Sequence, residues 1–286
     1  DEILAKIDAA AALQPAFRNL HSELSDARKL SESDAELLKD LDEEMRLAAR
    51  LQRDFLPRRL PEVGPVRFGV LYRPLGWVSG DIYDVVRLDE THVGFYVADA
   101  VGHGMPAALL TMFIKRALQT KRIVGNTYEI LPPHVSLHQL NAAICEQNLS
   151  SCQFCTACYC VLDTATLRMT YCRAGHPEAI LIRRDGSIAT LSGPGSLLGV
   201  FPEEQYSGSS MSLAAGDRLV LFSDGLEDAL TDQTGQGESL ACQLASLQGM
   251  GRDEMLLQLT AWIDARSGTG RASDDVTVVV MDVGGS

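Results

Sequence analysis

The chain has 286 residues, of which 46% are apolar and 22% are charged, so it is not a disordered protein and is expected to form one main domain with a smaller appendage. Its net charge of −13, without any run of Lys and Arg longer than two, argues against a nucleic-acid-binding surface. No apolar stretch approaches the length of about 18 residues that a membrane span needs, which predicts a cytoplasmic protein with no membrane span.

Residues 1–56 have the composition of helix, because they are rich in Ala, Leu and charged residues and contain no Gly. Two helices are predicted, and Ser33 with Glu36 forms a capping box at the start of the second. Its apolar residues are Leu37, Leu38, Leu41, Met45, Ala48, Leu51 and Phe55. This segment either packs on its own domain or pairs with a second copy in a homodimer. The first residue is not Met, which suggests a fragment preceded by a sensor or receiver module.

From Val66 onward, strands and helices occur in separate blocks. β-branched and apolar runs predict strands at 66–72, 83–88, 93–98, 155–163, 167–174, 178–184, 187–191, 208–213, 218–223 and 276–281. Helices are predicted from Pro106 to about Lys121, from a capping Ser136 to Leu149, and over 238–248 and 252–266. Strand runs without regular intervening helices indicate antiparallel sheets that pack together with helices outside them.

Four of the seven cysteines are spaced as in some zinc and iron–sulfur sites. They are Cys152, Cys155, Cys158 and Cys160. The segment has strand composition, so its side chains alternate between two faces and Cys155 cannot easily converge with Cys158 and Cys160. We favour reduced cysteines that pack as small apolar side chains over a metal cluster.

Four acidic motifs lie far apart in the sequence, each at the end of an apolar, β-branched run. They are Ser79-Gly80-Asp81, Ala98-Asp99-Ala100, Ser223-Asp224-Gly225 and Ser273-Asp274-Asp275. Converging carboxylates repel one another unless cations hold them, and hard oxygen ligands select Mg²⁺ or Mn²⁺. Two such ions about 4 Å apart could activate a shared water, and the resulting hydroxide would attack phosphorus in line. Each motif alone also fits an ordinary turn, so only the set predicts a metal site.

In their order and their residues, the motifs of residues 47–282 resemble those of the SpoIIE/RsbU branch of the PPM-type (type 2C) metal-dependent protein phosphatases. The matching stretches are 47–52 and 55–57, 79–84 with Ser79 where Gly is usual, 98–108, 174–177, 195–199, 223–226 and 274–278. The resemblance implies an α+β fold, a four-layer α/β/β/α sandwich of two antiparallel sheets flanked by helices. It also implies a helical regulatory segment at 1–56 and a phosphatase domain at 57–283.

Carried over by position, the resemblance implies that Asp99 bridges two Mn²⁺ or Mg²⁺ ions, with the backbone carbonyl of Ala100 as a further ligand. Asp81 would bind one ion, and Asp224 and Asp274 the other, partly through water. These four Asp residues would be the catalytic set. Two further residues would lie just outside the ligands, namely Asp275 and His103.

The roles of several neighbouring residues stay open in the sequence. His103 either holds its loop by a hydrogen bond or protonates the leaving group. His176, in an Ala-Gly-His-Pro turn, is interpreted as structural. No counterpart of the phosphate-binding Arg that eukaryotic relatives carry is identified near the first motif, although Arg73 is near it in sequence. Gly80 and Gly102 are expected to permit close approach of the backbone.

The sequence therefore predicts a metal-dependent serine/threonine protein phosphatase. By resemblance, its substrate is a phosphorylated STAS-domain anti-sigma-factor antagonist in a partner-switching pathway, and residues 1–56 set whether the second metal site forms. A catalytically silent scaffold that binds the same partner is the alternative, although a scaffold has no need of all four carboxylates. A metal-dependent nuclease is a third hypothesis, which the acidic surface opposes.

Overall fold

The structure is a computed structural model that describes residues 36–147, 154–231, 239–267 and 274–284. The chain divides into two compact units, residues 1–49 and 50–286. A helix over residues 36–55 crosses this division and agrees with the second predicted helix. The first predicted helix and Cys152 lie outside the described residues, and the domain boundary at residue 57 stays a prediction.

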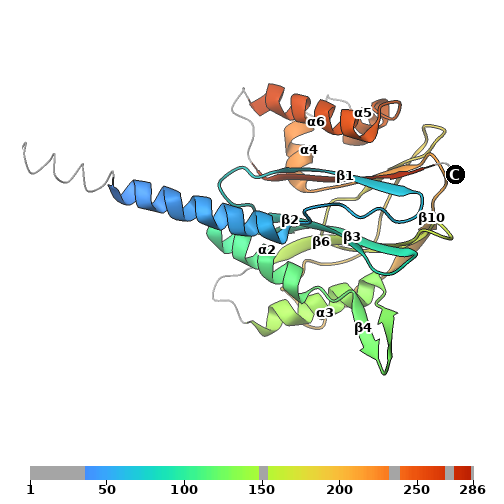
Figure 1. The fold of residues 1–286 in the computed structure, drawn as a ribbon, viewed down its shortest axis with the longest axis horizontal. Helices are drawn as coiled ribbons and strands as arrows, with labels where there is room; N and C mark the ends of the chain where they lie inside the picture. Colours follow the sequence, from blue (N-terminus) through green and yellow to red (C-terminus); the bar gives the residue numbers. More distant parts are fainter. Residues whose placement is uncertain (1–35, 148–153, 232–238, 268–273, 285–286) are drawn as a thin grey trace, which may run out of the picture. The chain divides into compact units, whose positions relative to one another are not determined.

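Two five-stranded antiparallel sheets form the centre of the second unit (Figure 1). The first sheet has the order β1-β12-β11-β8-β9. Its strands are β1 (Val66–Arg73), β8 (Ile180–Ile182), β9 (Ile188–Thr190), β11 (Arg218–Phe222) and β12 (Val276–Val283). The second sheet has the order β10-β7-β6-β3-β2. Its strands are β2 (Asp81–Arg87), β3 (His92–Ala100), β6 (Cys155–Asp163), β7 (Arg168–Ala174) and β10 (Ser209–Ser212).

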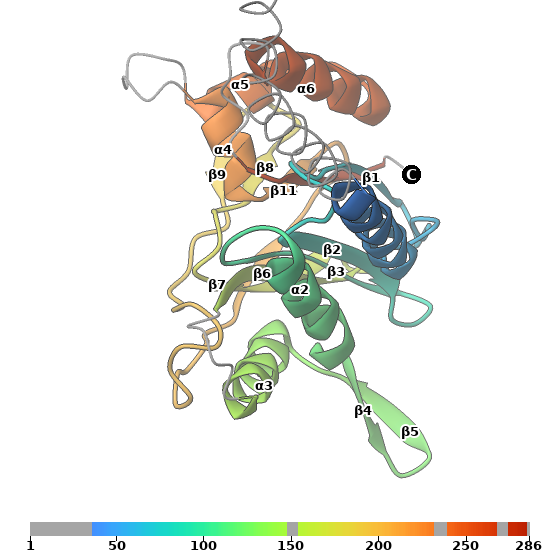
Figure 2. The ribbon, with the colours of Figure 1, turned by 90° about the vertical axis from the view of Figure 1, so that its left-hand side faces the viewer.

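Helices cover the outer face of each sheet, as the two views in Figures 1 and 2 show. The first sheet packs against α4 (Asp224–Leu230), α5 (Leu240–Ser246) and α6 (Arg252–Ser267). The second packs against α2 (Met105–Ala117) and α3 (Pro133–Glu146). These layers confirm the predicted α/β/β/α sandwich. Within the described part of the chain, none of the helices combines the length and apolar character required to span a membrane.

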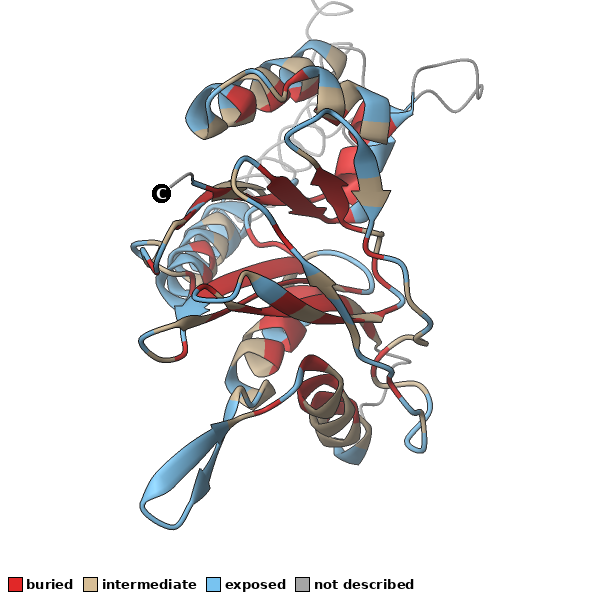
Figure 3. Cartoon of the chain, turned by 90° about the vertical axis from the view of Figure 1, so that its right-hand side faces the viewer, coloured by how far each residue is buried: buried red, intermediate tan, exposed pale blue. Residues whose placement is uncertain are grey.

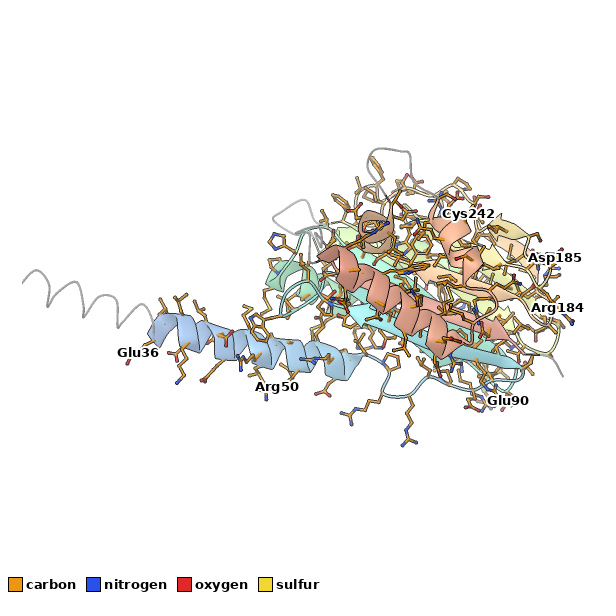
Figure 4. All side chains as sticks on the ribbon, turned by 90° about the horizontal axis from the view of Figure 1, so that it is seen from above. Glu36, Arg50, Glu90, Arg184, Asp185 and Cys242 are labelled. Atoms are coloured by element: carbon orange, nitrogen blue, oxygen red, sulfur yellow. The ribbon has the colours of Figure 1, made fainter. Side chains whose placement is uncertain are left out.

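Two clusters of buried apolar side chains hold the layers together, and they appear as the red strands of Figure 3. Strand β12 contributes to both, since Val279 and Met281 pack between the sheets while Val278 and Val280 pack beneath α4 to α6. A strand that is buried on both faces appears in the sequence as a continuous apolar run, and such a run predicted a strand at 276–281. Polar side chains, including the labelled Glu90, Arg184 and Asp185, lie at the surface (Figure 4).

A β-hairpin replaces the end of a predicted helix. Helix α2 ends at Ala117 instead of Lys121, and β4 (Lys121–Val124) then pairs with β5 (Thr127–Ile130). Gly125 has a φ of 61°, which suits the two-residue turn between these strands. The predicted end of the helix at Lys121 was wrong, because the hairpin is short and no proline separates it from α2. The hairpin projects from the layer of α2 and α3 (Figure 2).

Two helix starts also differ from the predictions. Helix α3 begins at Pro133, and Ser136, the predicted cap, is buried inside it. A proline in the first turn is the start signal that should have taken precedence. Helix α4 was not predicted, because its seven residues follow β11 directly and include Gly225.

The cysteines of β6 are packed in the core. Cys155, Cys158 and Cys160 are each 0% exposed and carry free thiols. Across the described ranges, no three His, Cys, Asp or Glu side chains are arranged to hold a metal ion as they stand. The prediction that the cysteines of this strand are buried is therefore confirmed for these three.

Candidate metal centre

The acidic motifs lie at one edge of the sandwich and come from both sheets. Asp81 begins β2 and Asp99 lies near the end of β3, and the two are direct partners in the ladder. Asp224 is the first residue of α4, immediately after β11, and Asp274 lies just before β12. Neighbouring β11 and β12 place these two residues side by side, because the backbone N–H of Ser223 donates to the carbonyl of Thr277.

A cleft of about 290 Å³ opens between these strand ends. Its lining residues are Asp99, Ala100, Val101, Gly102, His103, Phe154, Thr156, Asp224 and Asp274. Asp81 is only 1% exposed and does not line the cleft; its Oδ2 accepts a 2.6 Å hydrogen bond from the Ser223 hydroxyl. The structure therefore gathers Ala100 and three of the four predicted Asp ligands in one cleft, and holds the fourth Asp beside Asp99 but behind the surface.

The carboxylates of the cleft destabilise one another's charged forms. Burial raises the pKa of Asp99 to about 8, and the charges of Asp224 and Asp274 act in the same direction. Burial and the charge of Asp99 raise the pKa of Asp81 well above its usual range, although the Ser223 hydroxyl opposes this. The pKa values of Asp224 and Asp274 are raised as well, first by burial and then by neighbouring carboxylates. Such a set of oxygen donors fits divalent cations, whose charge would relieve this repulsion.

These shifts predict that the metal-free protein loses stability as the pH rises. Folded Asp99 binds its proton up to a pH of about 8, whereas an unfolded Asp releases it near about 4. The folded state therefore holds more protons in that window, and its stability falls across it. We expect the Tm in EDTA to be lower at pH 8 than at pH 5.5 and the trend to reverse with Mn²⁺, which binds the deprotonated groups. Thermal unfolding measures this, and the same slope with and without Mn²⁺ would contradict it.

Asp275 fixes the backbone that leads to Asp81. Its Oδ1 accepts from the N–H of Leu75 and its Oδ2 from the N–H of Gly80, both at 2.6 Å. A Cβ on Gly80 would lie 3.0 Å from the carbonyl oxygen of Ala100, so this glycine permits the expected close approach. Asp275 thus couples the start of β12 to the start of β2 without lining the cleft. Its place outside the metal ligands stays a prediction.

Gly225, next to Asp224, is packed against the same segment. A Cβ at this position would overlap the backbone carbonyl of Asp275. Gly225→Ala is expected to lower the free energy of unfolding by about 2–4 kcal/mol, since backbone cannot move aside as a side chain can. Urea unfolding in EDTA measures this. Gly249→Ala is the matched control, because a Cβ there meets open space and should change stability by less than about 0.5 kcal/mol.

The remaining predicted residues differ in how they approach the cleft. His103 is exposed and lines it, and its charge partly offsets the rise in the pKa of Asp274. Arg73 does not line it, because its Nη2 lies 2.5 Å from Asp264 of α6. Gly102 has a φ of 86° and open space where a Cβ would lie, so it is needed for its backbone conformation and the expected close approach was wrong.

Gln52 connects the end of the helix over residues 36–55 to the segment that leads into β2. Its Nε2 donates to the carbonyl of Ser79 at 2.7 Å and to Oγ1 of Thr111 on α2 at 3.0 Å. Its Oε1 accepts from the N–H of Ser79 at 2.9 Å, and the residue is only 3% exposed. A single side chain therefore joins this helix, α2 and the segment that begins β2.

A family model described as stage II sporulation protein E (SpoIIE) matches residues 89–284. The chain belongs to the SpoIIE family. It is 30% identical over 194 residues to phosphoserine phosphatase RsbU of Bacillus subtilis (strain 168), which covers 68% of this chain and 56% of RsbU. This SpoIIE-family chain spans about half the length of the curated relatives it matches.

Solved structures show the same fold. The SiaA-PP2C domain of Pseudomonas aeruginosa superposes with a TM-score of 0.71 at 24% identity, covering 86% of this chain and 98% of that domain. RsbX, solved in complex with magnesium, gives a TM-score of 0.58 at 18% identity over 78% of this chain and 98% of RsbX. These likenesses support the fold assignment of the SpoIIE-family chain, a PP2C sandwich.

For some residues of this SpoIIE-family site, the sequence alone predicted no role. Gln52 ends the matching stretch 47–52 in the second predicted helix, but its three hydrogen bonds depend on tertiary contacts. Ser223 was noted only as the neighbour of Asp224, and Thr156 only as part of a cysteine-rich strand. The register between β3 and β6 places Thr156 opposite Asp99, and only pairing of the strands reveals that.

Proposed function

We propose that this chain is a metal-dependent phosphatase that hydrolyses phosphoserine or phosphothreonine on a signalling protein. The observation that carries the proposal is the cleft between the two sheets, where Asp99, Asp224 and Asp274 converge without a neutralising Lys or Arg among the lining residues. Membership of the SpoIIE family and the likeness to RsbU, a phosphoserine phosphatase, support the same reaction.

The residues present fit two Mn²⁺ or Mg²⁺ ions. All the donors are hard oxygens, and burial, together with the charges of Asp224 and Asp274, raises the pKa of Asp99. Asp99 would be shared between the ions, with Ala100, Asp224 and Asp274 as further ligands and Asp81 joining after it leaves Ser223. When bound, the ions would activate water and neutralise the phosphoryl charge.

The chain's own groups would then bind and orient the substrate. Phe154 and Val101 give the cleft apolar walls beside the carboxylates, which limits access of bulk water to the phosphoryl group. His103 is an exposed imidazole that lines the cleft and would protonate the leaving serine oxygen. Gln52 holds the backbone of Ser79 and Asp275 holds the N–H of Gly80, and so they fix the position from which Asp81 would act.

The likeness to RsbU leads to a more specific proposal, in which the substrate is a phosphorylated STAS-domain anti-sigma-factor antagonist in the cytoplasm. All six described cysteines are free thiols, which agrees with a reducing compartment. Residues 1–56 would carry a signal to residues 57–283. Leu37 and Leu38 are 59% and 67% exposed, which supports pairing with a second copy in a homodimer. Sedimentation of the wild type and Leu38→Glu tests that pairing.

The direct experiment measures phosphate release from a phosphorylated STAS-domain protein and from a small aryl phosphate during a Mn²⁺ titration. We expect release from both substrates, dependent on Mn²⁺ and abolished by EDTA. Hydrolysis of the aryl phosphate alone would keep the phosphatase and overturn the STAS substrate. If neither is hydrolysed while the phosphorylated protein still binds, the chain is a scaffold for that partner.

A further inference from the structure

Thr156 is a hydroxyl-bearing residue of the cleft that lies directly beside Asp99. The two residues are partners in the antiparallel ladder between β3 and β6, so their side chains leave the same face of the sheet. Both line the cleft. Direct partners of this kind have Cβ atoms about 4.5–5.5 Å apart, so one water can contact both side chains.

A buried histidine holds the Thr156 hydroxyl. Nδ1 of His176 lies 2.7 Å from Oγ1 of Thr156, and His176 is 1% exposed. The chain around His176 is fixed on both sides, because Nη1 of Arg173 donates to its carbonyl at 2.6 Å and Gly175 adopts a φ of 63°. The imidazole therefore has a fixed position behind the wall of the cleft.

The Thr156 hydroxyl keeps an acceptor site toward the cleft. His176 is neutral, since burial lowers its pKa to about 3 in spite of the Phe222 carbonyl, which favours the charged ring. A neutral imidazole either accepts the proton of the Thr156 hydroxyl at Nδ1 or donates its own proton to Oγ1. In both cases Oγ1 uses one of its three hydrogen-bonding sites for His176 and retains a lone pair that can accept from a water in the cleft.

We propose that Thr156 accepts a hydrogen bond from the attacking water and that His176 is a positioning residue that acts through Thr156. This inference rests on the proposed function. As the water oxygen bonds to phosphorus and the ester P–O bond breaks, one water proton ends on the leaving serine oxygen and the other stays on the phosphate. Thr156 keeps its own proton throughout, so its contribution is to orient the water.

Thr156→Val removes the hydroxyl and keeps the shape of the side chain. We expect kcat to fall roughly 10- to 100-fold for the aryl phosphate and for the phosphoprotein. The KM and the Kd for Mn²⁺ by calorimetry should stay close to the wild type, because no ligand is lost, whereas the Tm should fall modestly because Nδ1 of the buried His176 loses its partner. Thr156→Ser should retain most of the activity. Thr170→Val is the matched control, since its hydroxyl bonds to the Val161 carbonyl outside the cleft.

His176 is tested by a double-mutant cycle. His176→Leu should lower kcat, and His176→Asn should recover part of it, because an Asn side chain can place a hydrogen-bonding group where Nδ1 lies. If His176 acts only through Thr156, the Thr156→Val/His176→Leu variant has the kcat of Thr156→Val alone. Should the His176 variants fail to fold, as their Tm would show, the Thr156 variants still decide the proposal.

Three results would overturn the inference. Thr156→Val could keep the kcat of the wild type, it could lose activity through a weaker Kd for Mn²⁺, or the double variant could lose the product of the two single losses. A wild type that releases no phosphate from either substrate would instead overturn the proposed function itself, and the inference with it.

Discussion

Asp99→Asn is expected to abolish phosphate release and at the same time to stabilise the metal-free protein. The loss of activity should reach at least about 10³-fold, because a shared carboxylate ligand supports several kcal/mol of charge stabilisation in the transition state. The gain in stability follows from the structure, where burial and the neighbouring carboxylates raise the pKa of Asp99 to about 8. A neutral amide of the same shape removes that repulsion.

The measurement pairs initial rates in Mn²⁺ with thermal unfolding in EDTA at pH 8. Mn²⁺ should raise the Tm of the wild type and leave that of Asp99→Asn nearly unchanged. Asp185→Asn is the matched control, since the Ser187 hydroxyl and N–H lower the pKa of this exposed Asp. It should keep full activity and show no gain in stability. If metal-free Asp99→Asn has a lower Tm than the metal-free wild type, Asp99 does not lie in a cation-binding cleft whose carboxylates repel one another.

Gln52→Leu is expected to cost both stability and activity. Leucine fills a similar volume but leaves the N–H and carbonyl of Ser79 buried without their partners, which costs about 2–4 kcal/mol. Ser79 directly precedes Gly80 and Asp81, so a loosened Ser79 should displace the predicted ligand. We expect phosphate release at saturating Mn²⁺ to fall roughly 10-fold or more at a temperature where the variant is still folded.

Urea unfolding and phosphate release separate the two effects of Gln52. Gln147→Leu is the matched control, because this exposed residue at the end of α3 makes only a 3.3 Å hydrogen bond to its own helix. Its free energy of unfolding should change by less than about 0.5 kcal/mol. If Gln52→Leu is destabilised but fully active when folded, Gln52 is a core residue without a part in positioning Asp81.

The fold could be predicted from the sequence wherever the pattern of apolar residues is local. The strands of both sheets and helix α6 lie within a few residues of their predicted bounds, since each is marked by a local run of apolar or β-branched residues, or by a helical period. The hairpin of β4 and β5 was missed because Ile123 is 83% exposed, so no buried face marks it. Ser136 misled because a serine before an apolar run is a cap only if it lies outside the helix.

The sequence indicated the carboxylates that line the cleft, but not the residues that hold them in place. Asp99, Asp224 and Asp274 could be found because each stands in a short motif at a strand end. Thr156 and Gln52 could not be assigned, since their roles depend on a strand register and on hydrogen bonds across many residues of sequence. Nor does the sequence show that Asp81 turns to Ser223, because that contact joins two different sheets.

The most direct test of the metal-dependent phosphatase is a single Mn²⁺ titration in which bound ions and phosphate release are measured together. Electron paramagnetic resonance counts the ions, and a phosphorylated STAS-domain protein serves as substrate. We predict that release rises as two ions fill the cleft of the wild type and that Asp99→Asn binds fewer ions and releases no phosphate. Phosphate release that continues in EDTA, or that is as fast in Asp99→Asn as in the wild type, would contradict a metal-dependent phosphatase.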